Sequence, residues 1–289
     1  VSVYKKEHPD AKLTDEQMVA DTPRDNVISY GRQVVWNQIW RNFCVSDTFE
    51  PGSPSKILTV AAGLEEGILK GNEYFQCDGF LNVGGWDIKC TAYRKGGHGS
   101  ISLKESIMQS CNVAMMRIGA MMGKSIFTKY QAIFGMGQKT GVDLPGEADA
   151  AGLVYTADKM GPTELATNAF GQNYNCTMIQ MAAALCSVIN GGSYYEPHVV
   201  KQILNDQGSV VETKDPVLVR ETVSPSTAEF LREAMFETVE TGTGGAAKVA
   251  GYHIGGKTGT AEKQPRSAKN YLLSFAGFAP VEDPQLLDR

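Results

Sequence analysis

The tetrapeptide Ser53-Pro54-Ser55-Lys56 stands directly before the apolar run Ile57–Leu64, and it is the first of three short motifs that decide how this chain can fold and act. The second motif is Ser110-Cys111-Asn112, and the third is Lys257-Thr258-Gly259-Thr260. Each motif by itself occurs by chance in many chains. The three in this order indicate acyl transfer at a serine, with a lysine doing the proton transfer that a histidine does in other serine enzymes.

Ser53 and Lys56 have the spacing of a nucleophile and its base, because residues three apart share one face of a helix. Pro54 favours a helix start, so Ser53 is predicted at a helix N-terminus, where backbone N–H groups favour developing negative charge. A lysine can accept the serine proton only if burial or a second cation lowers its pKa. The apolar run supplies burial, and Lys257 is the candidate second cation. An isolated S-x-x-K would be explained more simply as a helix cap beside a solvated lysine.

The second motif interrupts a helical pattern, since small polar side chains compete with the helix backbone for hydrogen bonds. Ser110 and Asn112 are therefore predicted on a connection between helices, facing a cleft. There Ser110 could relay a proton to a leaving amine, and Asn112 could hold a substrate amide. Cys111 between them is expected to be inert.

The third motif reads as the edge of a strand. Gly259 would let a substrate backbone come close, while Thr258 and Thr260 could bind a carboxylate. The backbone N–H groups of Ser53 and Thr260 could together form an oxyanion hole.

The rest of the chain predicts an α+β fold, with an all-helical section over about 71–190 inserted into an α/β framework. At 289 residues we expect one large domain or two lobes sharing a site. The first 45 residues predict a loop-rich lead-in. Predicted helices are 56–69, one beginning with the capping box Ser102–Glu105, 113–122, 125–134, 177–189 and 226–238. Predicted strands are a hairpin of 194–204 with 209–213, and the pair 252–261 and 271–279.

Composition excludes some classes of function. A net charge of −5 without a basic run argues against nucleic acid as a partner. No apolar stretch reaches the roughly 18 residues of a membrane span. The six cysteines fit no metal pattern, because no two have C-x-x-C spacing. Cys77 and Cys90 flank a possible hairpin; whether they form a disulfide or remain two free thiols stays open.

Two rival sites come from the same sequence. Gly251–Thr258 matches the phosphate-loop pattern G-x-x-x-x-G-K-[ST], but no apolar strand precedes it, and Gly259 and Pro265 disfavour the helix that should follow. Nucleotide hydrolysis is therefore only a remote alternative. Glu164 resembles a deacylating glutamate, but its position on a helix explains it equally well, and we discount a hydrolysing role.

The wider context resembles class B penicillin-binding proteins, specifically their division, elongation or sporulation branch in Gram-positive, clostridia-like bacteria. The resemblance runs from about Arg41 to Pro280. The motifs that carry it, besides the third one with Ala261, are Phe49-Glu50-Pro51-Gly52-Ser53, Phe170-Gly171-Gln172-Asn173, Asn190-Gly191-Gly192, Gly242-Thr243-Gly244 and Gly251-Tyr252.

This resemblance implies the penicillin-binding transpeptidase fold, an antiparallel sheet flanked by helices, which is shared with serine β-lactamases. It implies a D,D-transpeptidase that cross-links peptidoglycan stem peptides ending in D-Ala-D-Ala and that β-lactams inhibit by acylating Ser53. Lys56 would be the base, with Ser110, Asn112, Lys257, Thr258 and Thr260 completing the site. The resemblance implies no metal and no organic cofactor. A β-lactam sensor and a serine β-lactamase remain alternatives, and Asn112 favours the transpeptidase, because sensors usually have an apolar residue there.

Some positions depart from the family's pattern. Pro54 and Ser55 replace the usual threonine and bulky residue, and Asn173 replaces a glycine. The family also continues beyond Arg289 into a last strand and helix. We therefore expect residues 1–289 to be a fragment of a transpeptidase domain that lacks a membrane anchor and an N-terminal module. The resemblance places the protein on the extracytoplasmic face of the cell membrane, anchored by a transmembrane helix outside this chain, with membrane-bound cell-wall synthesis proteins as partners.

Overall fold

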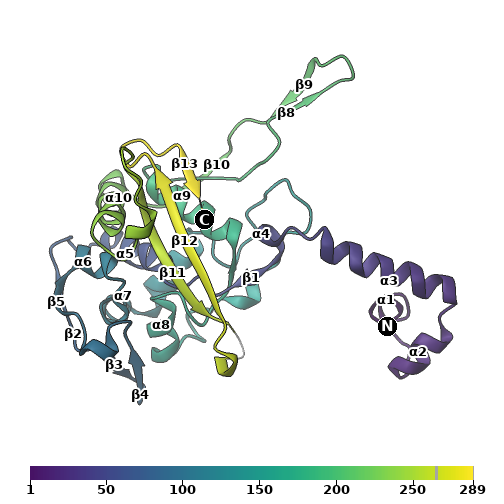
Figure 1. Ribbon diagram of the computed structural model, residues 1–289, viewed down its shortest axis with the longest axis horizontal. Helices are drawn as coiled ribbons and strands as arrows, with labels where there is room; N and C mark the ends of the chain where they lie inside the picture. The colour runs from purple at the N-terminus through teal and green to yellow at the C-terminus, as the bar shows by residue number, and fades with distance from the viewer. Residues whose placement is uncertain (264–265, 289) are drawn as a thin grey trace. The chain divides into compact units, whose positions relative to one another are not determined.

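The first helices occupy a stretch that the sequence predicts as loop-rich. The computed structural model describes residues 1–263 and 266–288 and divides into two units, Val1–Phe43 and the remainder from Cys44. The first unit contains α1 (Ser2–Glu7), α2 (Asp15–Asp21) and α3 (Arg24–Ile39) (Figure 1). The prediction of a loop-rich lead-in is wrong because Thr14 and Gln17 form a capping box that starts α2. Two buried side chains, Tyr4 and Met18, hold this unit together.

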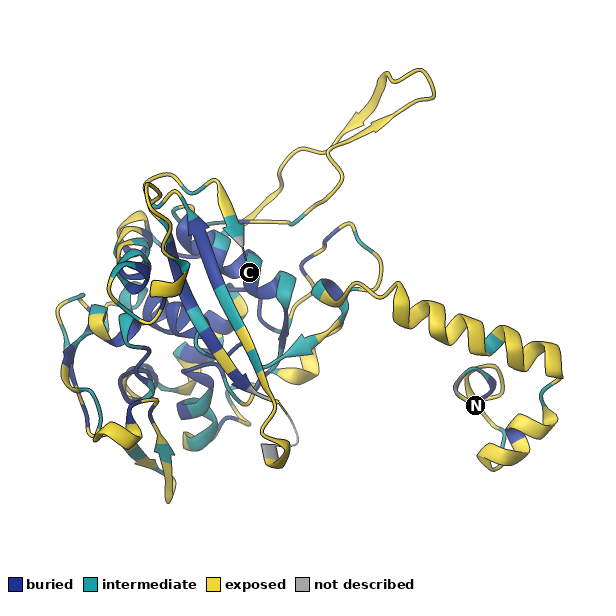
Figure 2. Cartoon of the chain, viewed as in Figure 1, coloured by how far each residue is buried: buried dark blue, intermediate teal, exposed yellow. Residues whose placement is uncertain are grey.

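The second unit is organised around an antiparallel sheet of β11 (Gly255–Glu262), β12 (Tyr271–Ala279) and β13 (Leu286–Asp288), in that order. The two long strands confirm the predicted pair, with Lys257 opposite Ala276 and Gly259 opposite Ser274. The sequence did not predict β13. Figure 2 shows that the strand pair is buried mainly at the end where β11 begins and β12 ends, at Gly255–Lys257 and Ala276–Phe278, so the sheet is a core element that carries the third motif.

Helices pack against this sheet and against one another. Helix α10 (Pro225–Glu240) contacts β11, α5 (Ser55–Glu65) and α9 (Met178–Ile189), and α5 also contacts α7 (Asn112–Ile133). Helix α5 is buried on nearly every side, with Ile57, Val60 and Ala61 fully inaccessible, as its uninterrupted apolar run predicts. The helices of this unit are α4 (Phe43–Ser46), α5 (Ser55–Glu65), α6 (Leu103–Met108), α7 (Asn112–Ile133), α8 (Pro162–Asn168), α9 (Met178–Ile189) and α10 (Pro225–Glu240).

Local sequence signals place several helix ends correctly. Ser102 and Glu105 form the predicted capping box at the start of α6. Gly123 separates two helical segments within α7, as the sequence predicts, because its φ of 71° and ψ of 166° break the helical backbone. No helix among the described residues is both long enough and apolar enough to cross a membrane.

Short strand pairs differ from the sequence-based expectation in two places. The section 71–190 is not all-helical, because its first third contains two antiparallel strand pairs. They are β2 (Tyr74–Cys77) with β5 (Gly99–Ser102), and β3 (Phe80–Val83) with β4 (Trp86–Lys89). The predicted hairpin of 194–204 is also partly wrong, since β7 pairs with β10 instead of continuing into β8. The pairs are β1 (Thr48–Phe49) with β6 (Cys176–Thr177), β2 (Tyr74–Cys77) with β5 (Gly99–Ser102), β3 (Phe80–Val83) with β4 (Trp86–Lys89), β7 (Ser193–Tyr195) with β10 (Leu218–Glu221), and β8 (Gln202–Leu204) with β9 (Val210–Thr213).

Candidate active site

A cleft at the start of α5 brings the three motifs together. It encloses roughly 640 Å³, counted into the adjoining solvent, between the N-terminal end of α5, the α6–α7 connection and strand β11. The residues that line it are Ser53, Thr91, Gln109, Ser110, Asn112, Phe170, Gln172, Thr243, Thr258 and Thr260. Five residues that the sequence singles out therefore share one surface, although they lie on three separate segments of the chain.

A chain of hydrogen bonds joins the first two motifs. Ser110 Oγ donates to Ser53 Oγ at 2.9 Å, and Lys56 Nζ donates to Ser110 Oγ at 2.9 Å. Lys56 Nζ also donates to the Ser110 carbonyl oxygen and to Asn112 Oδ1, each at 2.7 Å. Ser110 Oγ thus lies between the buried amine and the serine hydroxyl, where it can pass a proton from one to the other.

The connection between α6 and α7 holds Ser110 in an uncommon backbone conformation. Its φ is 55°, in the left-handed region that non-glycine residues rarely adopt. The next residue, Cys111, is fully buried and is the N-cap of α7, so the peptide on both sides of it is held by the core. Asn112 then begins α7 and donates its Nδ2 to the Lys89 carbonyl oxygen at 3.1 Å. Both side chains line the cleft, as predicted; Ser110 lies on the connection between the helices, while Asn112 is already the first residue of α7.

Burial sets the charge state of the two motif lysines. Lys56 is completely inaccessible, and this burial lowers its pKa to about 8, although the nearby Cys90 and Cys111 thiols act in the opposite direction. Lys257 is also fully buried, and its pKa lies well below the ordinary value, first because of burial and second because of the charge on Lys56. A lysine with a pKa of about 8 is a usable base near neutral pH, unlike a solvated one.

Gly259 also serves the packing of the protein itself, in addition to the close approach of a substrate backbone that the sequence predicts. A Cβ there would lie 2.2 Å from Ser274 Oγ and 2.8 Å from Pro54 Cδ. The missing side chain therefore lets strand β11 pack against the residue that follows Ser53, and the contact is internal to the protein. This close approach places the third motif beside the start of α5.

A second glycine contact supports the Ser53 segment from the other side. Gly52 donates its backbone N–H to the Gly171 carbonyl oxygen at 2.8 Å, and a Cβ on Gly171 would meet the Gly52 oxygen at 2.0 Å. Close by, Asn173 has φ 66°, a conformation that glycine and asparagine tolerate best. The substitution of asparagine for the family's glycine at this position thus preserves the backbone geometry.

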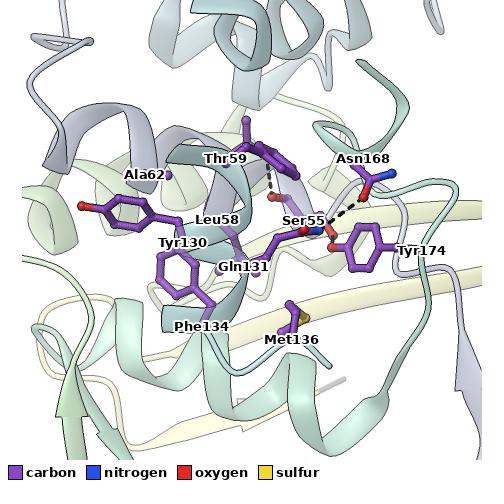
Figure 3. Close-up of a pocket in the computed structure, with 11 residues that line it drawn as sticks. Ser55, Leu58, Thr59, Ala62, Tyr130, Gln131, Phe134, Met136, Asn168 and Tyr174 are labelled. Atoms are coloured by element: carbon purple, nitrogen blue, oxygen red, sulfur yellow. Dashed lines mark hydrogen bonds between the residues drawn. The ribbon is translucent and has the colours of Figure 1, made fainter. Parts of the chain in front are cut away.

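Ser55 lines a small pocket behind the active-site helix. Its Oγ is 2.6 Å from Tyr174 Oη, inside the molecule, and Figure 3 shows both side chains at one end of the pocket. Gln131 Nε2 donates to Asn168 Oδ1 at 3.4 Å, while Gln131 Oε1 has no hydrogen-bond partner among the described residues. The family has a bulky residue at position 55. In this chain the small Ser55 side chain leaves room for the Tyr174 hydroxyl, which hydrogen-bonds to it.

The structure adds Thr243 to the residues that the sequence predicts for the site. Thr258 Oγ1 donates to Thr243 Oγ1 at 3.2 Å, and Thr243 Oγ1 donates to the Met108 carbonyl oxygen at 3.0 Å. Thr243 thus links the third motif to the end of α6. The Gly242-Thr243-Gly244 segment carries part of the family resemblance and was the signal that could have identified it.

Four potential metal ligands gather beside the second motif: Cys77, Cys90, His98 and Cys111. The inference from sequence that the cysteines fit no metal pattern considered local spacing alone, and folding brings distant residues together. Cys77 and Cys90 are both in the thiol form, so the possible disulfide between them is not formed. The Cys111 thiol donates to the Cys90 sulfur at 3.8 Å, and this bond lowers the pKa of Cys90 and raises that of Cys111.

The two rival sites do not acquire the geometry that they need. Gly255–Thr258 are part of strand β11, so the phosphate-loop pattern is not followed by the helix that would carry the phosphate. Glu164 lies in the first turn of α8, where a carboxylate favours the helix dipole, and the described lining of the cleft does not include it.

Comparisons with known proteins agree with this geometry. The family model of the penicillin binding protein transpeptidase domain matches residues 10–287. The chain is 39% identical over 253 residues to Stage V sporulation protein D of Bacillus subtilis, covering 86% of this chain and 38% of that protein. It spans about two fifths of the length of the curated relatives it matches.

Solved structures show the same likeness. The D,D-transpeptidase domain of a peptidoglycan glycosyltransferase from Eggerthella lenta superposes with a TM-score of 0.78 at 25% identity, over 89% of this chain and 65% of that one. Penicillin binding protein 3 from Mycobacterium tuberculosis, solved in complex with aztreonam, has a TM-score of 0.73 at 30% identity, over 84% of this chain and 56% of that one.

Proposed function

The chain belongs to the penicillin-binding protein transpeptidase family, in its class B branch, and on that premise we propose that it carries the active site of a serine D,D-transpeptidase that cross-links peptidoglycan stem peptides. The observation that carries the proposal is the hydrogen-bonded chain from Lys56 Nζ through Ser110 Oγ to Ser53 Oγ. It supplies an activated nucleophile next to a cleft.

In the first half-reaction, Ser53 Oγ attacks the carbonyl carbon of the penultimate D-alanine. Its proton passes through Ser110 to neutral Lys56, and the oxyanion forms near the backbone N–H groups of Ser53 and Thr260. When the tetrahedral intermediate collapses, the C–N bond breaks and the amine of the terminal D-alanine takes the proton back along the same path. The product is an ester of Ser53 and free D-alanine.

In the second half-reaction, an amine on a neighbouring stem peptide attacks the ester. It loses a proton to Lys56; as the C–O bond to Ser53 breaks, Ser53 Oγ takes a proton back from Lys56 through Ser110, which restores the starting state. Thr258 and Thr260 bind the carboxylate of the donor peptide, with Lys257 adding charge when it is protonated. Asn112 binds the donor backbone amide. A β-lactam acylates Ser53 in the same way, but its leaving amine stays tethered and the adduct persists.

The relatives' names support the class of reaction. Several are called peptidoglycan D,D-transpeptidases, and one is a sporulation protein. We therefore propose that residues 1–289 are part of a longer protein held at the extracytoplasmic face of the bacterial membrane by a transmembrane helix outside this chain. Its partners there would be membrane-bound proteins of cell-wall synthesis, in division, cell shape or sporulation.

Acylation by a fluorescent penicillin tests this proposal. A stable adduct that mass spectrometry places on Ser53, and that is absent from Ser53→Ala, is the expected result. Rapid release of the label would identify a β-lactamase. Folded protein that forms no adduct would contradict the assignment of Ser53.

Release of D-alanine separates the enzyme from a sensor. With a peptide ending in D-Ala-D-Ala and an amine acceptor, the protein is expected to release D-alanine and form the new amide, whereas Ser53→Ala does neither. A protein that is acylated by penicillin but releases no D-alanine would be a β-lactam sensor.

A further inference from the structure

We propose, on the premise that the chain acts as a transpeptidase, that a groove beside the active-site cleft binds the acyl acceptor and favours an acceptor strand that carries a carboxylate. The groove lies between the segment 91–98, the C-terminal end of α6 and the loop 241–243. It encloses roughly 920 Å³, counted into the adjoining solvent, which is the size of a pocket for a ligand of several hundred daltons.

The groove is continuous with the cleft. Thr91, Gln109 and Thr243 line both of them. Two other hollows, which meet at Glu50, share no lining residue with the cleft. A peptide whose amine lies at Ser53 can therefore extend into this groove along a surface that the cleft already shares.

The groove opens at the end of the cleft where the first product leaves. In the proposed reaction Thr258 binds the carboxylate of the terminal D-alanine, and Thr258 Oγ1 donates to Thr243 Oγ1 at 3.2 Å. Thr243 in turn lines the groove. Attack of an amine on the Ser53 ester reverses the expulsion of an amine from it, so the incoming amine takes the place that the leaving amine has vacated. The acceptor strand therefore enters from the Thr243 side.

The charge of the groove selects the acceptor. Lys95 is exposed on the lining, and its ammonium has no ion-pair or hydrogen-bond partner among the described residues. The described lining contains no carboxylate. A cation without a counter-charge in a groove attracts and orients an anionic group of a partner. An acceptor strand with a carboxylate behind its attacking amine supplies that group.

The backbone beneath Lys95 is held in place. Lys95 ends a short 3-10 turn, Tyr93–Lys95, and its N–H donates to the carbonyl oxygen of the buried Ala92 at 2.9 Å. The N–H of Gly97 donates to the same oxygen at 3.1 Å, and a Cβ on Gly97 would meet the Cys77 oxygen at 2.0 Å. The Lys95 side chain thus starts from a fixed point on the rim of the groove.

Gln109 offers the acceptor a second contact. Its half-buried side-chain amide has no hydrogen-bond partner among the described residues, while its backbone N–H donates to the Glu105 carbonyl oxygen at 2.8 Å. A side-chain amide both donates and accepts, so it can pair with one peptide group of the acceptor strand. Gln109 directly precedes Ser110, so this contact would hold the strand next to the proton path.

Competition between an acceptor peptide and water tests the groove. The donor is a peptide ending in D-Ala-D-Ala, and the acceptors are C-terminally amidated glycine peptides with glutamate at the second, third or fourth position, each matched by glutamine. The measured quantity is the ratio of new amide to hydrolysed donor. At one or more positions the glutamate peptide should give a ratio about threefold or more above its glutamine counterpart at low ionic strength. This excess should shrink at about 1 M NaCl, where the Debye length is about 3 Å.

Lys95→Gln should abolish the glutamate preference by raising the KM for the acidic acceptor, with little change in kcat, whereas Lys95→Arg should keep the preference. Arg94→Gln is the matched control, because Arg94 is the exposed neighbour of Lys95 but is absent from the described lining. It should behave as wild type. Each ratio is compared with that variant's own rate of acylation by a fluorescent penicillin, so a general loss of activity does not count as a loss of preference.

Two results would overturn the role of the groove: equal ratios for the glutamate and glutamine peptides at all positions in wild-type protein, or a glutamate preference that survives in Lys95→Gln. Either result, obtained with protein that releases D-alanine and forms the new amide, leaves the transpeptidase proposal standing. Folded protein that forms no acyl-enzyme and releases no D-alanine would overturn both proposals.

Discussion

The pH dependence of acylation tests whether Lys56 is the base. Lys56 must be neutral to accept the Ser53 proton, and its burial lowers its pKa to about 8. With that pKa, about one molecule in eleven carries neutral Lys56 at pH 7, and about ten in eleven do at pH 9. The second-order rate constant for acylation should therefore rise about tenfold between pH 7 and pH 9 and then level off.

Several charged or titratable groups surround Lys56 and bear on this value. Cys90 and Cys111 raise its pKa, and Lys257 is the cation whose own pKa Lys56 lowers. A lysine with the ordinary pKa of 10.5 would give a rise of about a hundredfold over the same range, with no plateau. The slope therefore distinguishes a buried lysine from a solvated one.

The assay is the rate of fluorescent penicillin acylation between pH 6 and about pH 9.5, with circular dichroism at each pH to verify folding. Lys56→Arg is the matched control, because arginine keeps its charge over this range. It should lose at least about a hundredfold in rate at every pH and show no rise. A flat wild-type profile between pH 7 and pH 9 would refute the assignment of Lys56 as the base.

Three substitutions test the contacts that support the site, each by urea unfolding. Gly171→Ala places a Cβ 2.0 Å from the Gly52 oxygen, and should cost about 3 kcal/mol or more; a loss under about 1 kcal/mol would contradict the close contact. Tyr174→Phe leaves the buried Ser55 hydroxyl without this partner and should cost about 1–3 kcal/mol, most of it recovered in the double variant with Ser55→Ala. Asn173→Gly should be nearly neutral, whereas Asn173→Val should cost about 1–2 kcal/mol, because φ is 66° there; equal effects would argue against the left-handed backbone.

Much of the secondary structure follows from short-range signals. The capping box at Ser102, the uninterrupted apolar run of α5 and the glycine break at Gly123 all act within one or two helical turns. The helix and strands that the sequence did not predict also depend on short-range signals or on their absence. The capping box at Thr14 is a local signal that the sequence analysis overlooked. Strands β2 to β5 are four residues each, too short for a clear periodic pattern, and their partners decide their structure.

The residue types of the site could likewise be chosen from sequence. Ser53 lines the cleft just before α5 and Lys56 is buried within the first turn of that helix, and their spacing of three residues is a local relation. The pairing of β11 with β12 also follows from two neighbouring strand segments joined by a polar loop. The chemistry of a lysine-assisted serine was therefore predictable from the three motifs.

Only the tertiary structure decided how those residues meet. Folding places Ser110 between Lys56 and Ser53, packs Gly259 against Pro54, and brings three cysteines and His98 together from separate elements. Helix starts and strand alternation depend on neighbours a few residues away, so the sequence states them directly. Contacts between residues tens of positions apart depend on how all the helices and strands pack together. The spacing of residues in the sequence does not determine that packing.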